Sequence, residues 1–297
     1  MALHDVLVCL DGTGTGRLEL VTKLARQENA YVTAVYTMPV PQGTASWPSG
    51  AGVPPTILGP VSPAGAAAIS GEPLAATEPA TQVVREAVRA DEVEQLFRAE
   101  LSSRGLKGEW HIFDRTDLAE LVQLSQASDL AILGQYDNDS DGIIWLQPDD
   151  LLINSGRPVL IVPYAGTFDR IGTRVLVAWD GTREANRALH DVLPMIGGAA
   201  AVTVMHFGTA QADLDADRPQ LERIIGHLAR HGIKARPENT PRGDIPISDL
   251  LLSRAADLGA DMIVAGAYHH SPLRESLLGG VSRELVAHMT VPVLMSH

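Results

Sequence analysis

The chain repeats itself, and this repeat limits its possible folds more than any other feature. The stretch VLVCLDGT at residues 6–13 returns as VLVAWDGT at residues 175–182, an offset of 169 residues. The stretch RPVLIV at residues 157–162 returns as VPVLMS at residues 291–296, an offset of 134. The sequence therefore predicts a duplicated unit joined near residues 164–172, whose first copy carries about 35 extra residues.

The length of the chain agrees with two copies that each form a domain. Its 297 residues suffice for two domains of ordinary size with separate cores. We expect a first domain over residues 1–164 and a second over residues 172–297. The extra residues lie at 39–79, which hold nine of the nineteen prolines among alanine, glycine and serine. This composition predicts a long loop; we favour an inert or dimer-covering loop over a functional lid.

Apolar runs and helical spacings alternate along the second copy. Strands are expected at residues 174–179, 201–207, 233–237, 262–265 and 292–296, and helices at 183–195, 218–231, 245–258 and 279–289. The first copy follows the same order, with its second helix near residues 81–103. Strands that alternate with helices at this spacing form a parallel sheet covered on both faces.

Charge and cysteine usage exclude several classes of protein. The chain has 23 basic and 36 acidic residues, a net charge of −13, without a basic block. This argues against a nucleic-acid partner, because affinity for nucleic acids comes mainly from the neutralisation of phosphates.

No apolar run approaches the ~18 residues that span a bilayer, and no signal-peptide pattern begins the chain, so we expect a cytoplasmic protein. The single cysteine, Cys9, lies in an apolar run and is expected to be a buried core residue.

Residues 261–282 carry the clearest ligand-binding pattern. A short apolar run ends at Gly266, a polar loop follows, and Gly279, Gly280 and Val281 begin a helical pattern. The glycines allow close approach of the backbone, and a helix N-terminus offers unpaired N–H groups and a favourable dipole to a phosphate. Turns without a ligand carry glycines too, so the pattern alone does not decide the function.

These features resemble the universal stress protein family, in its tandem type with two domains. The resemblance rests on VAWDGT at residues 177–182, VMHF at 204–207, the glycine-rich stretch and the closing VPVLMS. It covers essentially the whole chain apart from residues 39–79. It implies an α/β fold of two tandem doubly wound parallel five-stranded sheets, of order 3-2-1-4-5, like the adenine nucleotide alpha hydrolases. Strands one and four then meet at the topological switch point, where ligands bind.

The resemblance also implies a function in the stress response. It implies a protein that binds ATP or AMP in its second domain, with Mg only as the companion of the nucleotide and no other metal. Nucleotide occupancy would then bias the binding of protein partners, and we expect no enzyme activity beyond a weak ATP hydrolysis that is left open. An enzyme that transfers an adenylyl group would need a positively charged catalytic side chain at the phosphates, and Arg274 and Arg283 are the candidates.

The implied nucleotide site lies in the second copy. Its residues are Asp180, Gly181, Thr182, Phe207, Gly266, Ala267, His269, Gly279, Gly280, Val281 and Ser282. By the resemblance, Asp180 faces the ribose, Phe207 lines the adenine side, and the N–H groups at residues 279–281 meet phosphates.

The chain keeps the ATP-binding pattern of the family only in part. That pattern is Gly-x-x-Gly, nine residues, then Gly followed by Ser or Thr. Here His269 stands at the second glycine and Gly280 at the hydroxyl position, for which Ser282 could substitute. A histidine that must adopt φ > 0 costs roughly 1–2 kcal/mol, or its ring could fill the phosphate space. A nucleotide-binding protein and a scaffold with empty clefts therefore both stay open.

The first copy departs further from the pattern. Its loop after Gly134 carries Asp137, Asp139 and Asp141, which would repel phosphates, so we expect a degenerate domain without a nucleotide. A calcium site there is disfavoured, because Pro148 stands where an EF-hand needs glutamate. The adjacent His269 and His270 are equally weak candidates for metal ligands.

The closing strands of the two copies, at residues 159–162 and 293–296, are apolar edges that need covering. The family resemblance implies that they pair across a pseudo-twofold axis, so that one chain imitates a homodimer of single domains. Further homodimerisation and the identity of protein partners are left open.

Overall fold

The structure is a computed structural model of the chain. It describes residues 3–11, 15–38, 40–41, 78–113, 117–135, 143–144, 148–168, 170–208, 211–241, 243–267 and 280–297. Most of the proline-rich stretch at residues 39–79 lies outside this set, so the loop expected there stays a prediction.

Strands and helices alternate through the first half of the chain. Its elements are β1 (Asp5–Leu10), α1 (Thr15–Glu28), β2 (Tyr31–Thr37), α2 (Glu78–Arg104), β4 (Gly108–Phe113), α3 (Leu118–Gln126), β5 (Leu130–Gly134), α4 (Pro148–Asn154) and β7 (Val159–Val162). Two short strands, β3 (Val40–Pro41) and β6 (Ile143–Ile144), pair antiparallel with each other. The sequence pattern did not indicate this pair.

The second half repeats the alternation. Its elements are β8 (Arg174–Ala178), α5 (Arg183–Asp191), α6 (Leu193–Ile196), β9 (Ala201–Gly208), α7 (Gln211–Arg230), β10 (Ala235–Pro241), α8 (Ile247–Leu258), β11 (Met262–Gly266), α9 (Gly280–His288) and β12 (Val293–Ser296).

Two prolines account for the main differences from the expected helices. The helix expected at residues 183–195 is divided at Val192 into α5 and α6, because Pro194 lacks the N–H that would continue the α5 hydrogen bonding. The helix expected to begin at residue 218 begins at Gln211 instead. Pro219, whose missing N–H suits the first turn of a helix, here lies inside α7.

The third strand of the second half is also displaced from its expected position. It was expected at residues 233–237 but runs over β10. Ile233, whose N–H donates to the Leu228 carbonyl at 3.0 Å, is buried in the turn that precedes it.

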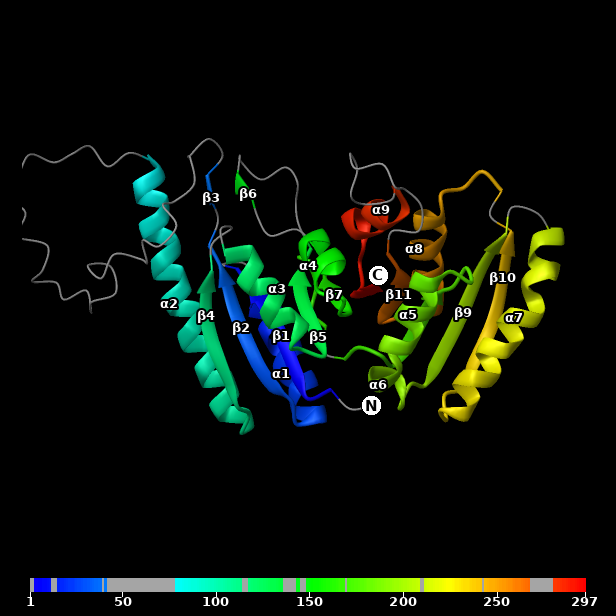
Figure 1. The fold of residues 1–297 in the computed structure, drawn as a ribbon, viewed down its shortest axis with the longest axis horizontal. Helices are drawn as coiled ribbons and strands as arrows, with labels where there is room; N and C mark the ends of the chain where they lie inside the picture. The colour runs from blue at the N-terminus through cyan, green and yellow to red at the C-terminus, as the bar shows by residue number, and fades with distance from the viewer. Residues whose placement is uncertain are drawn as a thin grey trace, which may run out of the picture.

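All ten long strands form one continuous sheet, of order β10-β9-β8-β11-β12-β7-β5-β1-β2-β4 (Figure 1). Within each half the strands are parallel and follow the order 3-2-1-4-5, which confirms the expected fold class. The halves meet where β7 and β12 pair antiparallel, with Leu294 opposite Leu160. The expected pairing of the closing strands is therefore confirmed, and the two five-stranded sheets are continuous.

Two apolar clusters, one on each face of the sheet, form the core. On one face the buried side chains of α1, α2, α5 and α7 pack on the sheet, and on the other those of α3, α4, α8 and α9 do so. The strands that both faces cover are apolar on both sides, as their continuous apolar runs predict. Cys9 is 3% exposed, so the expectation of a buried core cysteine is confirmed.

Candidate functional site

The second half has a topological switch point at the carboxyl ends of β8 and β11. These strands are parallel neighbours, with Val177 opposite Val264. From β8 the chain continues to β9 on one side, whereas from β11 it continues to β12 on the other. Connections that diverge in this way leave the strand ends uncovered by a crossover, which is where open α/β sheets bind ligands.

Buried contacts fix the end of β8. Trp179 is 1% exposed, and its indole N–H donates to Asn186 Oδ1 at 3.0 Å. His206 on β9, 4% exposed, has Nδ1 at 3.0 Å from the Trp179 carbonyl oxygen and Nε2 at 3.1 Å from Asp217 Oδ2. The backbone that presents Asp180 is therefore held from two sides.

The next three residues form a tight turn into α5. Gly181 has φ = +78°, a conformation that other residues adopt only with strain. The Thr182 N–H donates to Asp180 Oδ1 at 3.0 Å, and the Thr182 hydroxyl caps α5 by accepting from the Ala185 N–H at 3.2 Å. The Asp180 side chain is exposed, so its carboxylate is accessible to a ligand.

Gly266 ends β11 directly beneath the first turn of α5. A Cβ at this position would lie 2.5 Å from the Ala185 nitrogen and 2.6 Å from the Glu184 carbonyl carbon. Since both atoms belong to the backbone, no rotamer change could relieve the contact. Gly266 is thus explained by the packing of α5 on the sheet, without a ligand.

Ala267 lies in the core under the site. It is fully buried, its N–H donates to the Ser296 carbonyl at 2.9 Å, and its carbonyl oxygen lies 3.2 Å from His297 Nδ1. Both of its backbone groups are therefore engaged, so Ala267 offers a ligand no hydrogen bond.

The remaining described site residues come from β9 and α9. Phe207 lies half-buried near the end of β9, the strand next to β8. Gly280 and Val281 are exposed in the first turn of α9, where N–H groups lack intrahelical partners. Ser282 is 7% exposed, so its side chain is largely buried and poorly placed to replace a missing hydroxyl.

Several expected site residues lie outside the described residues. They are His269 and Gly279, together with Asp137, Asp139, Asp141, His270 and Arg274. Their roles stay as predicted from the sequence. Among the residues that the structure does describe, no group of three or more His, Cys, Asp or Glu side chains could hold a metal ion.

An arginine fills the corresponding position in the first half. Arg17 on α1 is 7% exposed, and its guanidinium donates to the Cys9 carbonyl at 2.8 Å and to Asp11 Oδ2 at 3.2 Å from each terminal nitrogen. It lies against Gly134, where a Cβ would overlap Arg17 Nη2. A cation of the chain itself therefore pairs with the aspartate that corresponds to Asp180.

The sequence analysis did not identify Arg17, or its counterpart Asn186 in the second half, as residues of the two switch points. The repeat offset of 169 residues aligns Arg17 with Asn186, which donates from Nδ2 to the carbonyl oxygens of Gly181 and Thr182 at 3.2 and 2.8 Å. An alignment of the two copies could have shown the difference, but only the tertiary contacts show that Arg17 points into the switch point.

Comparisons with known proteins agree with this architecture. Residues 173–297 match the model of the Universal stress protein family. The chain also superposes on solved structures along nearly its whole length. A universal stress protein from Archaeoglobus fulgidus DSM 4304 gives a TM-score of 0.66 at 16% identity, with 98% of this chain and 95% of that chain covered.

Two further structures superpose over a similar length. A putative universal stress protein from Pseudomonas aeruginosa UCBPP-PA14 gives a TM-score of 0.57 at 15% identity, with 99% and 93% covered. A functionally unknown protein from Pseudomonas aeruginosa PAO1 gives 0.55 at 16% identity, with 99% and 92% covered. None of the curated proteins matched the sequence.

The comparisons thus show the tandem universal stress protein fold, and the second half matches the family in sequence as well. None of the helices in the described part of the chain is both long and apolar enough to cross a membrane.

Proposed function

We propose that this chain, with the fold of a tandem universal stress protein, binds an adenine nucleotide, ATP or AMP, at the switch point of its second half. The nucleotide would alter how the chain binds protein partners in a cytoplasmic stress response, without being turned over. The family match over residues 173–297 supports the ligand class, because the family resemblance implies adenine nucleotides. We also propose residues 1–164 and 172–297 as the two domains.

The observation that carries the proposal is the difference between the two switch points. In the first half Arg17 occupies the space beside Asp11, whereas in the second half Asp180 is exposed on a rigid strand end. One copy therefore carries a built-in cation, and the other leaves its carboxylate accessible to a ribose hydroxyl. This difference supports one nucleotide per chain.

The described residues suggest the roles of individual groups. Asp180 would accept hydrogen bonds from the ribose, and Phe207 on the adjacent strand would pack against the adenine. The N–H groups of Gly280 and Val281, in the first turn of α9, would donate to a phosphate.

A scaffold without a nucleotide is the second candidate. His269 and Gly280 depart from the family pattern in the sequence, and in the structure Ala267 has no free backbone group while Ser282 is largely buried. These observations favour weaker phosphate contacts than the family pattern provides.

Calorimetric titration with ATP at pH 7.5 tests the proposal, preceded by native mass spectrometry of the purified chain for a retained nucleotide. We expect one site, and a loss of affinity of about tenfold in Asp180→Ala, because a charged hydrogen-bond partner of the ribose is removed. Glu222→Ala is the matched control, since it removes one exposed carboxylate from α7 of the same half. Equal losses in both variants would contradict the site, and ADP formed during the titration would contradict the absence of turnover.

The variant His269→Gly separates the two candidates if the wild-type chain does not bind. It restores the second glycine of the family pattern and removes an imidazole from the loop. Binding by His269→Gly but not by the wild-type chain would show a blocked nucleotide site. No binding by either at pH 6 or pH 8 would establish the scaffold.

A further inference from the structure

A concave basic site lies far from the switch point, at the end of the first half where α1 and α2 terminate. It is a surface cavity, largely open to solvent, of about 640 Å³ and is lined by Lys23, Arg26, Gln27, Arg104 and Arg170. Four of its five lining residues are cations, although the whole chain has a net charge of −13. A volume of this size is within the range that small-molecule ligands occupy.

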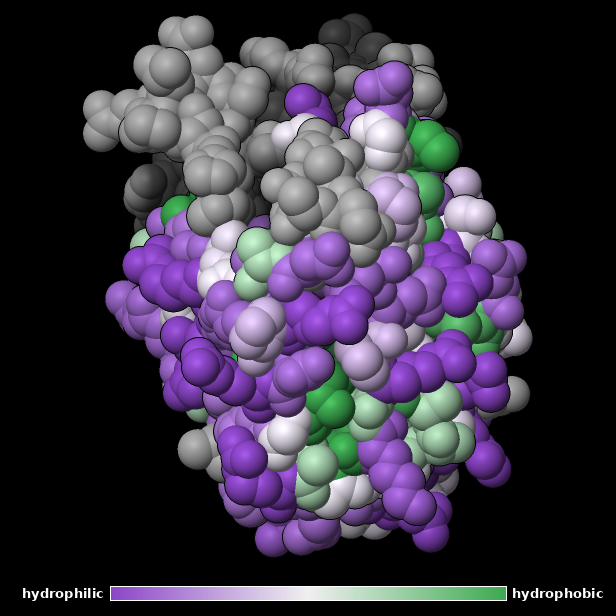
Figure 2. All heavy atoms as spheres, turned by 90° about the vertical axis from the view of Figure 1, so that its right-hand side faces the viewer, coloured by the Kyte–Doolittle hydropathy of each residue, from purple (hydrophilic) through white to green (hydrophobic). Residues whose placement is uncertain are grey.

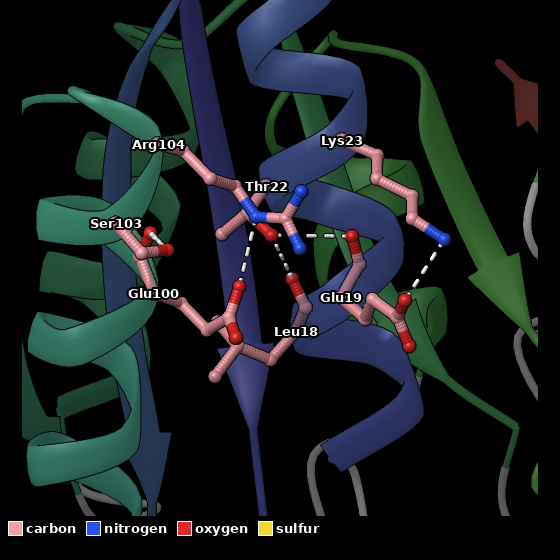
Figure 3. Close-up of polar contacts among 7 residues, drawn as sticks. All are labelled: Leu18, Glu19, Thr22, Lys23, Glu100, Ser103 and Arg104. Atoms are coloured by element: carbon pink, nitrogen blue, oxygen red, sulfur yellow. Dashed lines mark hydrogen bonds and ion pairs between the residues drawn. The ribbon is translucent and has the colours of Figure 1, made fainter.

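Two of the four cations are partly neutralised by carboxylates. Lys23 Nζ lies 2.8 Å from Glu19 Oε1 on α1, and Arg104 Nε lies 2.8 Å from Glu100 Oε2 on α2. Figure 3 shows both pairs, with the Arg104 side chain extending from α2 toward α1. These partly exposed pairs follow helical i,i+4 spacing and contribute little to stability.

The other two cations have no carboxylate partner within the described part of the chain. Arg26 is exposed in the last turn of α1, and Arg170 is exposed in the connection between the halves. Arg26 and Arg170 therefore add two positive charges to the cavity beyond the two cations that pair with Glu19 and Glu100.

Helix dipoles explain only part of this arrangement. Basic residues in the last turns of α1 and α2, such as Arg26 and Arg104, complement the partial negative charge at helix C-termini. Arg170 belongs to no helix. It is held beside the cavity because Phe168 and Ile171, on either side of it, pack against the core. The connection thus adds a cation where neither helix end requires one.

We propose that this cavity binds a small anionic ligand that carries at least two phosphate groups. The cations lie on two helices and on the connecting segment, and a chain of phosphates, with charged oxygens along its length, can contact more of them than a single phosphate can. Arginine suits this role because its planar guanidinium donates two parallel hydrogen bonds to phosphate oxygens. Gln27 could add a neutral donor from the same helix.

The proposal is independent of the nucleotide site. The cavity lies at the C-terminal ends of α1 and α2 in the first half, whereas Asp180 lies at the carboxyl end of β8 in the second half. Loss of one site should therefore leave the other intact.

Calorimetric titration of the full chain with inorganic tripolyphosphate at 0.15 M salt tests the proposal. We expect a single site, with about a tenfold loss of affinity in Arg26→Gln and again in Arg170→Gln, because each removes a charged hydrogen-bond donor. Arg223→Gln and Lys234→Gln are the matched controls, since they remove exposed cations of the second half. Orthophosphate should bind at least tenfold more weakly than tripolyphosphate.

Three results would overturn the proposal. They are no tripolyphosphate binding by the wild-type chain, equal losses in the control variants, or equal affinity for orthophosphate. In a further arm the Arg170→Gln variant is titrated with AMP, which the switch point is proposed to bind, and the affinity of the wild-type chain is expected. Displacement of tripolyphosphate from the wild-type chain by AMP would place the phosphates at the switch point instead. A parallel titration of the wild-type chain and of Arg170→Gln with a nucleoside triphosphate distinguishes a free polyphosphate from one attached to a larger molecule, because Arg170→Gln weakens only binding at the cavity.

Discussion

Arg17 and Asn186 stand at the same position of the repeat, and their side chains have opposite effects on the two switch points. The guanidinium of Arg17 extends across the strand ends to Asp11 and the Cys9 carbonyl. The shorter amide of Asn186 turns back to its own helix start and to Trp179. One residue type therefore decides whether the aspartate that ends the first strand is paired internally or left accessible.

The first prediction concerns the Arg17–Asp11 pair, whose side chains are 6% and 14% exposed. Asp11→Ala should lower the free energy of unfolding by about 3 kcal/mol, because it leaves a buried guanidinium without its counter-charge. Asp180→Ala, in which an exposed carboxylate loses one hydrogen bond, should lower it by about 1 kcal/mol. Urea denaturation followed by tryptophan fluorescence measures both values.

Cys9 supplies a local probe for the same prediction. Burial raises the pKa of the Cys9 thiol to about 12, while the Arg17 guanidinium acts to lower it and the Asp11 carboxylate acts to raise it. The thiol is therefore buried and protonated near neutral pH, and alkylation requires the first half to open. Asp11→Ala should accelerate alkylation of Cys9 at pH 8, whereas Asp180→Ala should leave the rate near that of the wild-type chain. Equal rates in both variants would mean that the pair does not stabilise the first half.

At the scale of elements, α5 and α7 meet through three histidines. The ring of His227 on α7 lies 4.9 Å from that of His190 on α5 and 4.6 Å from that of His231, between ring centroids. Desolvation lowers the pKa of His227, and the positive charges that His190, His231 and Arg230 can carry lower it further. Protonation of His227 is therefore less favourable in the folded chain than in a free histidine.

The second prediction follows from the sign of this shift. In the unfolded chain His227 takes up a proton as pH falls through about 6.5, whereas in the folded chain it does so only at lower pH. The unfolded state binds more protons in this window, so the contribution of His227 to stability is present above pH 7 and is lost as pH falls below about 6.5. His227→Gln should reduce the drop in urea midpoint between pH 7.5 and pH 5.5. His4→Gln, at an exposed position in the first half, is the control and should leave the drop unchanged.

In the whole molecule, strand pairing and side-chain hydrogen bonds join the halves within the described part of the chain. β7 and β12 pair antiparallel, the Gln135 amide donates to the carbonyls of Val286 and Ala287 at the end of α9, and Arg187 donates to the Gly156 carbonyl at 2.7 Å. The closing strands therefore lie at the centre of a ten-stranded sheet, and each half covers the edge of the other.

The outer edges of the sheet differ from each other. β10 carries Pro237 and Pro241, which cannot donate to a further strand, whereas β4 carries no proline. The end of the molecule at β10 and α7 is mostly hydrophilic on its surface (Figure 2). Both features protect this edge from pairing with another chain.

The third prediction removes the strand at the centre. Truncation after Thr290 deletes β12 and leaves the edges of β7 and β11 without partners, so the truncated chain should aggregate. Light scattering during refolding measures this, and deletion of His297 alone, which leaves β12 intact, is the control. A truncated chain that stays monomeric and melts cooperatively would contradict the role of this pairing.

From the amino-acid sequence alone, the alternation of strands and helices in two copies could be predicted, because a parallel strand buried on both faces must be apolar along its length. The strand order 3-2-1-4-5 and the pairing of the closing strands were implied by the family resemblance, and the structure confirms both. The sequence also placed Asp180, Gly181 and Thr182 at a strand end, where the structure finds them.

Contacts between distant side chains became known only from the structure. Arg17 reaches Gly134, the rings of His190 and His227 contact each other in a tilted arrangement, and Arg170 lies beside the helix ends of the first half. Gly266 proved to be required by α5, although its place in a glycine-rich motif suggested a ligand. Hydrophobic periodicity indicates which face of a helix or strand is buried, but it does not indicate which residue of another element that face contacts. Those pairings arise from packing between segments that are far apart along the chain.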